Sequence, residues 1–341
     1  MKNVVCHSNY GVLNKNGNML NGVGNVSVKD FLNQMAELKR YGIENDIILK
    51  TSDEISVTDA DAFIFVDMPE IDSDYFRGAI STGKPMFLLA WESGIINARN
   101  SNPQLHANFR TIFTYDDSLI DNDKYIKVGY SFDLPQHIQK TYEGKKLCCL
   151  IAGNKVSNHP LELYSHRLEA IDWFEKNHPD EFDLYGQGWN KIIPPQNLLH
   201  RIVNKFEFIN QHVKSQYVSY RGEVDDKLAT YKNYLFSICY ENARDFPGYI
   251  SEKIFDCFFA GCVPVYWGAP NISHYIPENC YIDRRKFKDN EELYSYLAQM
   301  RESEYSIYLH SIESFLQNGE NGVFSVDYFS KKIIDNILKY I

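Results

Sequence analysis

The feature that most constrains the fold is an alternation of short apolar runs with amphipathic segments, which occurs twice along the 341 residues. Apolar runs rich in β-branched and aromatic residues predict buried strands, and segments with a 3.6-residue apolar period predict helices. Strands that alternate with helices form parallel sheets with helices on both faces. A polar stretch with Pro135 and Gly144, residues 131–146, separates the two series. We therefore expect an α/β protein with two Rossmann-like domains.

The first series contains one clear helix, from an N-cap at Ser27 to a glycine stop at Gly42. Its predicted strands are residues 2–8, 44–51, 61–67, 84–93, 111–117 and 124–132. The second series has predicted strands at 146–154, 182–189, 234–242, 263–268 and 280–287, and predicted helices at 163–178, 225–233, 251–261 and 325–341. Ligands of open α/β sheets bind beyond the carboxyl ends of the strands, so candidate site residues are those that follow strands.

Composition excludes several classes of protein. The net charge of −10 argues against general nucleic-acid binding, which needs a basic face. The seven cysteines include no C-x-x-C pair and lie mostly in apolar runs, which indicates buried free thiols and a reducing compartment. The N-terminal segment has no long apolar run, so we expect a cytoplasmic protein, at most peripherally attached to the cytoplasmic face of a membrane.

The segment 234–268 combines a buried strand, a loop, a helix and a second strand. The first strand delivers Glu241 and Asn242 to the ligand edge of its sheet. A helix N-terminus attracts phosphate, and Lys253 in the first turn adds a cation there. Glu252 beside it suits the hydroxyls of a ribose or a sugar. On composition alone, an ordinary solvated charge pair is the favoured interpretation of Glu252 and Lys253.

A family resemblance favours the ligand-binding interpretation. The segment YENARDFPGYISEKIFDCFFAGCVPVYWGAPNISHYIPENCYID resembles the signature region of glycosyltransferase family 10, the α1,3/4-fucosyltransferases. The matching positions are Glu241, Asn242, Tyr249, Glu252, Lys253, Gly261, Pro264, Gly268 and the YIPENCYID run. Upstream, the segments GNKVSNHPLELYSHRLEAIDWF, FDLYGQGW and DDKLATYKNYLFSICYEN are similar to other parts of the family. The resemblance covers about residues 146–290 well and the N-terminal half weakly.

The resemblance implies a GT-B fold, in which two Rossmann-like domains with parallel sheets face a central cleft. It implies an acceptor-binding domain at 1–140, a GDP-sugar-binding domain at 146–320 and a C-terminal helix at 321–341 that packs back on the N-terminal domain. Arg167 and Lys253 would bind the donor diphosphate. Asn242, Tyr249 and Glu252 would line the nucleotide and the fucose.

Three further residues are candidates for the donor site, and each of them also has a structural interpretation. Arg244 is a candidate for phosphate contact, or it pairs with Asp245 or Asp256. Tyr185 and Gly186 belong to a strand-end turn, with Gly188, where a guanine or ribose could pass, and a purely structural turn is the alternative.

Glu92 is the candidate catalytic residue. It follows a predicted strand, and a similar E-S-P segment supplies the catalytic base in the family. Gly94 stands here in place of the usual proline, which is a departure from the family pattern. Attack of an acceptor hydroxyl on an anomeric carbon requires a general base, and a carboxylate can serve. A salt bridge or a helix cap is the alternative role for Glu92.

Two other features are weaker candidates. Asp59 and Asp61 have the D-x-D spacing of metal-dependent transferases, but a turn cap before a core strand is the favoured interpretation. His7, at the end of the first strand, is either an acceptor contact or a structural histidine. We expect no metal ligands and no required cofactor, with GDP-fucose as a substrate.

The resulting hypothesis is an inverting fucosyltransferase that transfers L-fucose from GDP-β-L-fucose to a glycan hydroxyl, with an α1,3 linkage to a GlcNAc- or Glc-type sugar. Such an enzyme would contribute to cell-surface polysaccharide or lipopolysaccharide, and its partners would be the donor and an oligosaccharide or lipid-linked glycan. Two alternatives to this hypothesis remain. One is an enzyme of the same fold that uses another GDP-linked deoxy-sugar or heptose as its donor, and the other is a catalytically silent glycan- or nucleotide-binding module.

Overall fold

The computed structural model describes residues 1–22, 29–190, 217–319 and 322–341. The chain divides into two compact units. Unit 1 comprises Met1–Leu134, Phe246–Ile250 and Asn318–Ile341, and unit 2 comprises Pro135–Asp245 and Ser251–Gln317. The first division lies at Leu134 and Pro135, before the expected boundary at 140, and the short segment Phe246–Ile250 belongs to unit 1 although its flanking residues belong to unit 2.

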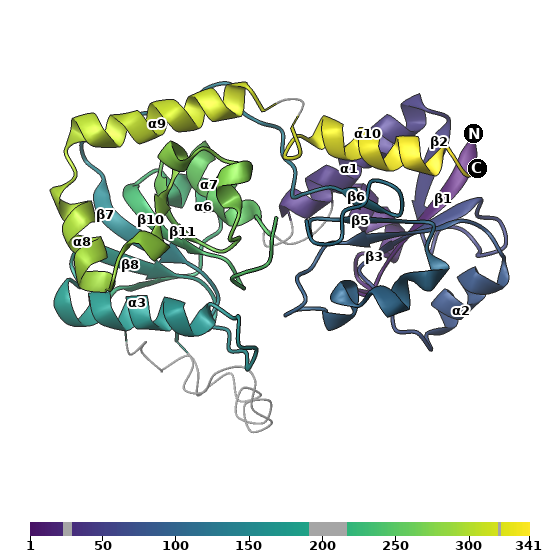
Figure 1. Cartoon of the computed structure of the whole chain (residues 1–341), viewed down its shortest axis with the longest axis horizontal. Coiled ribbons are helices and arrows are strands. Elements are labelled where there is room, and N and C mark those ends of the chain that lie inside the picture. The colour runs from purple at the N-terminus through teal and green to yellow at the C-terminus, as the bar shows by residue number, and fades with distance from the viewer. Residues whose placement is uncertain (23–28, 191–216, 320–321) are drawn as a thin grey trace. The chain divides into compact units, whose positions relative to one another are not determined.

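Unit 1 is built on a six-stranded sheet with the strand order β2-β1-β3-β4-β5-β6, in which every neighbouring pair is parallel (Figure 1). The strands are β1 (Lys2–Ser8), β2 (Ile47–Thr51), β3 (Ala62–Val66), β4 (Met86–Ala90), β5 (Thr111–Thr114) and β6 (Tyr125–Lys127). The α-helices of this unit are α1 (Lys29–Glu44), α2 (Asp74–Ser81) and α10 (Val326–Ile337). Short 3-10 helices lie at Lys15–Leu20, Ala98–Ser101 and Pro103–Asn108.

Side-chain alternation along these strands divides the core of unit 1 into two layers. Phe63 and Phe65 of β3 pack with Phe76 of α2 on one face of the sheet. On the other face, α10 packs beside α1, and Phe87 of β4 contacts Tyr340 just after α10. The sheet is therefore covered by helices on both of its faces, as the alternating sequence predicts.

Unit 2 contains a second parallel six-stranded sheet with the order β12-β11-β10-β7-β8-β9. Its strands are β7 (Lys146–Ile151), β8 (Phe182–Tyr185), β9 (Tyr220–Gly222), β10 (Tyr234–Tyr240), β11 (Val263–Trp267) and β12 (Ile282–Asp283). Its α-helices are α3 (Tyr164–Asn177), α6 (Lys227–Tyr231), α7 (Glu252–Phe259), α8 (Asn290–Gln299) and α9 (Glu302–Gln317). Short 3-10 helices lie at Ile272–His274, Glu278–Cys280 and Arg284–Lys286.

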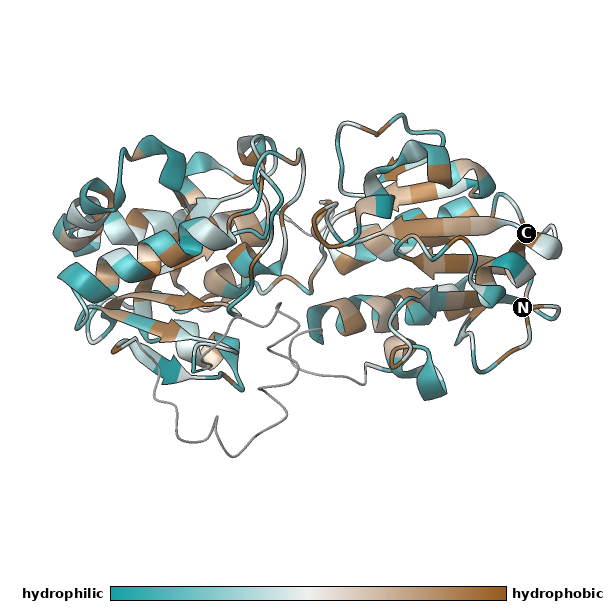
Figure 2. Ribbon diagram, turned by 90° about the horizontal axis from the view of Figure 1, so that it is seen from below, coloured by the Kyte–Doolittle hydropathy of each residue, from teal (hydrophilic) through white to brown (hydrophobic). Residues whose placement is uncertain are grey.

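Helices α3 and α7 lie on opposite faces of the unit 2 sheet (Figure 1). Phe174 of α3 stacks on Phe182 of β8 with 4.7 Å between ring centroids, while α6 and α7 pack against β10 and α7 also packs against β11. Figure 2 shows the hydrophobic strands of each unit inside more polar helices. This arrangement brings one helix from each face to the end of β10.

Several expectations can be compared with the described residues. All seven cysteines are buried and unpaired, as predicted. The predicted helix start at Ser27 lies outside the described residues, and α1 ends at Glu44, two residues beyond Gly42. No helix in the part of the chain that the structure describes is long and apolar enough to cross a membrane.

Candidate functional site

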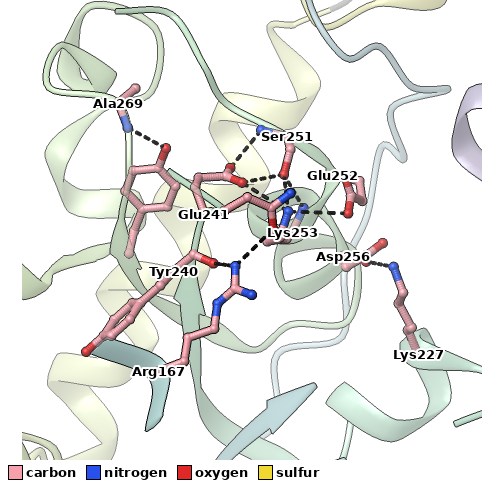
Figure 3. Close-up of polar contacts among 11 residues, drawn as sticks. Arg167, Lys227, Tyr240, Glu241, Ser251, Glu252, Lys253, Asp256 and Ala269 are labelled. Atoms are coloured by element: carbon pink, nitrogen blue, oxygen red, sulfur yellow. Dashed lines mark hydrogen bonds and ion pairs between the residues drawn. The ribbon is translucent and has the colours of Figure 1, made fainter. Parts of the chain in front are cut away.

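The carboxyl end of β10 carries a buried acidic residue. Every residue of β10 is buried, and Glu241, which follows the strand, has no exposed surface. Its carboxylate accepts hydrogen bonds from the backbone N–H and the hydroxyl of Ser251, at 2.8 and 2.6 Å, and from Nζ of Lys253 at 3.1 Å (Figure 3). A buried carboxylate is stable only with such partners. Glu241, a candidate donor-site residue, therefore directs its carboxylate oxygens to groups of the protein at the start of α7.

Ser251 links this carboxylate to the helix. Its hydroxyl oxygen accepts from the backbone N–H of Lys253 at 3.5 Å, which confirms the predicted N-cap of α7. Nζ of Lys253 donates to the same oxygen at 2.9 Å. The ammonium of Lys253 is therefore held at the helix N-terminus, where the helix dipole also attracts anions.

The Glu252 and Lys253 side chains are both partly accessible, with exposed fractions of 25% and 22%. Burial would raise the pKa of the Glu252 carboxyl, but the charges of Lys253 and Lys227 outweigh burial and lower this pKa to about 2. Burial would also lower the pKa of Lys253, but Glu241 and Glu252 outweigh it and raise that pKa. Both groups therefore stay charged at neutral pH, so Glu252 can only accept hydrogen bonds and Lys253 can only donate them.

A second cation reaches the same strand end from the other face of the sheet. Arg167 of α3 is 5% exposed, and its guanidinium donates to the backbone oxygen of Tyr240 at 2.6 Å and to Oδ1 of Asn242 at 3.2 Å. Its charge acts to lower the pKa of Lys253, as expected for two neighbouring cations. Figure 3 shows Arg167 and Lys253 on either side of the end of β10. Two converging cations beside a helix N-terminus form a site suited to a polyanion such as a diphosphate.

Asn242 lies at the same edge and is half-buried. Its backbone oxygen accepts from the N–H of Leu163, immediately before α3, and its side chain accepts from Arg167. The structure thus brings together four predicted site residues from unit 2: Arg167, Asn242, Glu252 and Lys253.

Arg244 lies in the loop that follows. Its guanidinium pairs with Asp245 at 2.5 Å and donates to the backbone oxygen of Pro160 at 3.3 Å. Of the two partners considered for Arg244, the structure selects Asp245, since Asp256 pairs with Lys227 at 2.9 Å. Arg244 therefore has a local structural role beside the candidate site.

Tyr249 occupies a different place from the one the chain order suggests. It belongs to unit 1 and is only 1% exposed, and its ring lies 5.0 Å from that of Tyr115. Gly248 explains why the loop can pack there, because a Cβ on this glycine, at φ 79°, would lie 2.3 Å from the backbone oxygen of Tyr115. In this arrangement Tyr249 is a core residue of unit 1.

Tyr185 is the last residue of β8, and Gly186 follows it. The Tyr185 hydroxyl lies 2.8 Å from that of Tyr234, which in turn donates to Asp183 at 2.7 Å. Gly186 has φ 123°, and a Cβ there would come within 2.0 Å of the backbone oxygen of Ala152, so the chain needs a glycine at this close approach. These contacts give the turn a structural role of its own.

Glu92 lies in unit 1, two residues beyond the end of β4, and is half-buried. Its backbone N–H donates to Oδ1 of Asp67 at 2.9 Å, and its backbone oxygen accepts from Nδ2 of Asn100 at 2.9 Å. Gly94 is closely packed, since a Cβ there would lie 2.7 Å from the Ser101 hydroxyl. The sequence analysis predicts no role for Asp67 or Asn100. Asp67 ends the apolar run 61–67, and this position at a strand end could have identified it as a candidate. No comparable sequence pattern marks Asn100.

The weaker candidates have structural partners. His7 stacks on Tyr75 with 4.2 Å between centroids, its Nδ1 lies 2.8 Å from the Ser52 hydroxyl, and burial lowers its pKa to about 4. Asp61 accepts from the backbone N–H of Asn3 at 2.8 Å, which is the expected turn-cap role. Within residues 1–22, 29–190, 217–319 and 322–341, no group of three His, Cys, Asp or Glu side chains is placed to hold a metal ion.

Part of the chain is similar in sequence to known proteins. The family "Glycosyltransferase family 10 (fucosyltransferase) C-term" matches residues 145–316, half of the chain. An α-(1,3)-fucosyltransferase from Helicobacter pylori is 24% identical over 197 residues, which are 54% of this chain and 39% of the relative. The chain therefore spans about two fifths of the length of that relative.

Two solved structures resemble the whole chain. A crystal structure of an α1,3-fucosyltransferase with GDP-fucose is 15% identical, with a TM-score of 0.53 over 99% of this chain and 90% of the other. An α-glucosyltransferase in complex with UDP and DNA is 11% identical, with a TM-score of 0.58 over 99% and 100%. At such identities the likeness concerns the fold, which is GT-B as expected. Because the family matches half of this chain, the chain belongs to glycosyltransferase family 10, the fucosyltransferase family.

Proposed function

We propose that this protein is a fucosyltransferase that uses GDP-fucose as its donor. The observation that carries the proposal is the convergence of Lys253 and Arg167 at the end of β10, beside the N-terminus of α7. Family membership supports the same reaction class, as do the similar proteins, among which one solved structure holds GDP-fucose.

In this proposal the donor diphosphate lies against the two cations. Lys253 is held by Glu241 and Ser251, and Arg167 by Tyr240 and Asn242, so both charges are positioned before the donor arrives. Pre-positioned cations stabilise the negative charge that develops on GDP as the glycosidic bond breaks. We therefore expect transfer to proceed without an added divalent metal ion, and activity that is abolished by a chelator and restored by a metal would contradict this expectation.

Glu252 receives a different part of the donor. Its carboxylate is ionised at neutral pH, and it lies 3.6 Å from Nζ of Lys253. An ionised carboxylate accepts hydrogen bonds from hydroxyl groups and repels phosphate. We assign it to hydroxyls of the ribose or the fucose, while Lys253 and Arg167 contact the phosphates.

The proposed reaction is a single displacement with inversion. Glu92 accepts the proton of the acceptor hydroxyl as the hydroxyl oxygen forms its bond to the anomeric carbon. The bond from that carbon to the β-phosphate oxygen breaks, and its electron pair leaves with GDP. A β-linked donor thus gives an α-fucoside. Glu92 follows β4 at the carboxyl edge of the unit 1 sheet, where α/β proteins place reactive groups.

For the acceptor we propose a glycan with a GlcNAc- or Glc-type sugar that receives fucose in α1,3 linkage. The H. pylori relative carries α-(1,3) in its name, which supports this linkage. We further propose a role in cell-surface polysaccharide or lipopolysaccharide synthesis on the cytoplasmic side of the membrane.

The product of the reaction tests the proposal. Purified protein is incubated with GDP-fucose and a panel of oligosaccharides that end in GlcNAc, Glc or Gal, and the product is examined by NMR of its anomeric proton. We expect an α-fucoside on a GlcNAc- or Glc-type sugar. A β-fucoside would contradict inversion, and product formed only with another GDP-sugar would contradict the choice of donor.

A further inference from the structure

The loop that carries Glu92 is fastened by two buried side chains that come from elsewhere in unit 1. Oδ1 of Asp67, just after β3, accepts from the backbone N–H groups of Trp91 and Glu92, both at 2.9 Å, and from Nδ2 of Asn100 at 2.7 Å. Asn100 also donates from Nδ2 to the backbone oxygen of Glu92 at 2.9 Å. Both backbone groups of Glu92 are thus bound by the same pair of side chains.

Asn100 also binds the backbone of the loop that follows β3. Its Oδ1 accepts from the backbone N–H of Met68 at 2.7 Å, while the backbone oxygen of Met68 accepts from Asn9 and Asn97, at 3.1 and 3.2 Å. One amide therefore ties the loop after β3 to the loop after β4. Asp67 and Asn100 are each 4% exposed, so water competes little for these hydrogen bonds.

Asp67 carries two costs that its packing does not explain. It has φ 64°, a left-handed conformation that residues other than glycine rarely adopt. It is also a buried carboxylate, and the three donors to its Oδ1 in the described structure are all neutral groups. A strained backbone and a buried acid at the carboxyl edge of a parallel sheet are features found at functional positions.

We propose that Asp67 and Asn100 are positioning residues that fix the direction of the Glu92 side chain by holding its backbone on both sides. The inference rests on the proposed function, in which Glu92 is the general base. Asp67 and Asn100 act through the Glu92 backbone and do not contact the substrate. A general base must stay within hydrogen-bond reach of the proton that it removes, and a misplacement of about 1 Å can cost about 100-fold in rate.

Paired variants at position 67 separate hydrogen bonding from charge. Asp67→Gly accepts the left-handed backbone but removes the acceptor oxygen, whereas Asp67→Asn keeps an oxygen in the same place. We expect Asp67→Gly to lower kcat for transfer at least tenfold and Asp67→Asn to recover most of that loss. The KM for GDP-fucose and the Kd for GDP should stay within twofold of wild type in both variants.

Asn100→Asp provides an independent test. It keeps the acceptor for the Met68 N–H, but it turns a carboxylate toward Asp67 and the backbone oxygen of Glu92. We expect a loss of kcat at least as large as that of Asp67→Gly, again with unchanged donor KM. Asp61→Asn is the control, because Asp61 binds a backbone N–H at the opposite end of β3, and its kcat should match wild type.

Glu92→Gln, measured alongside, separates the two hypotheses. If Glu92→Gln is inactive while Asp67→Gly and Asn100→Asp keep kcat within twofold of wild type, the positioning role is wrong and the proposed function stands. If Glu92→Gln is fully active, the base assignment is wrong and the positioning role falls with it. If Asp67→Gly does not fold, as judged by its Tm and GDP binding, Asn100→Asp decides by the same criterion.

Discussion

The carboxyl edges of the two sheets are built in opposite ways. At the end of β10 in unit 2, cations and carboxylates contact each other directly, with Lys253 between Glu241 and Glu252. Beyond β4 in unit 1, the backbone of Glu92 is held by Asp67 and Asn100. In our proposal, the first arrangement holds charged groups in place to bind an anion. The second holds the backbone of Glu92 so that its carboxylate can accept a proton.

The largest effect should come from the unit 1 edge. Glu92→Gln removes the proposed base without changing the size of the side chain, so we expect kcat for transfer to fall by about 100- to 10,000-fold. The affinity for GDP should not change, because the proposed nucleotide contacts are all in unit 2. Steady-state kinetics and calorimetry with GDP measure the two effects. Weaker GDP binding in this variant would break the division of roles between the edges.

A substitution at the carboxyl edge of the unit 2 sheet should change the affinity for GDP. Lys253→Ala removes a charged donor to phosphate, and we expect GDP affinity to fall by about 10- to 100-fold. The Tm should fall too, because the buried carboxylate of Glu241 loses its cation. Lys227→Ala is the matched control, since Lys227 is a neighbouring lysine of similar exposure, at 26%, that pairs with Asp256. Equal losses of GDP affinity in the two variants would contradict a specific phosphate role for Lys253.

A smaller effect should appear in the acid stability of the protein. The folded pKa of Glu252 is about 2, below the usual value of 4.5, so the folded state favours the ionised form. Its contribution to stability is present above pH 4.5 and is lost as the pH falls toward 2. Glu252→Gln should remove this part of the pH dependence of Tm. An identical pH profile for wild type and variant would show that the Glu252 carboxylate is not stabilised by Lys253 and Lys227.

The smallest effect should come from Arg244. Its side chain is 32% exposed and pairs with Asp245. Salt bridges between exposed side chains contribute little to the stability of a protein. We expect Arg244→Ala to change GDP affinity less than about twofold, as measured by calorimetry. A tenfold loss would instead place Arg244 among the residues that bind the donor.

Much of the fold could be predicted, because local sequence patterns determine most of its strands and helices. Apolar runs specify the strands, and the serine at position 251 specifies the start of α7. The rule that ligands bind beyond strand ends also predicts that Glu92, Glu241 and Asn242 lie at the ligand-binding edges of their sheets. These features depend on residues close together in the chain.

The roles of individual side chains depend on contacts between distant residues, which local patterns do not contain. Successive side chains of a strand point to opposite faces, but the pattern does not say that Glu241 turns toward Ser251 and Lys253 and is buried there. Likewise, chain order places Tyr249 with its neighbours, while aromatic packing places it against Tyr115 in unit 1.

Release of GDP from GDP-fucose tests the central claim most directly. Purified wild-type protein is mixed with GDP-fucose, with and without the mixed oligosaccharide acceptors, and free GDP is followed over time. The account predicts GDP release that is faster with acceptor, that is nearly lost in Glu92→Gln, and that needs a higher GDP-fucose concentration in Lys253→Ala. No release of GDP from GDP-fucose by the folded wild-type protein, with or without acceptors, would contradict it.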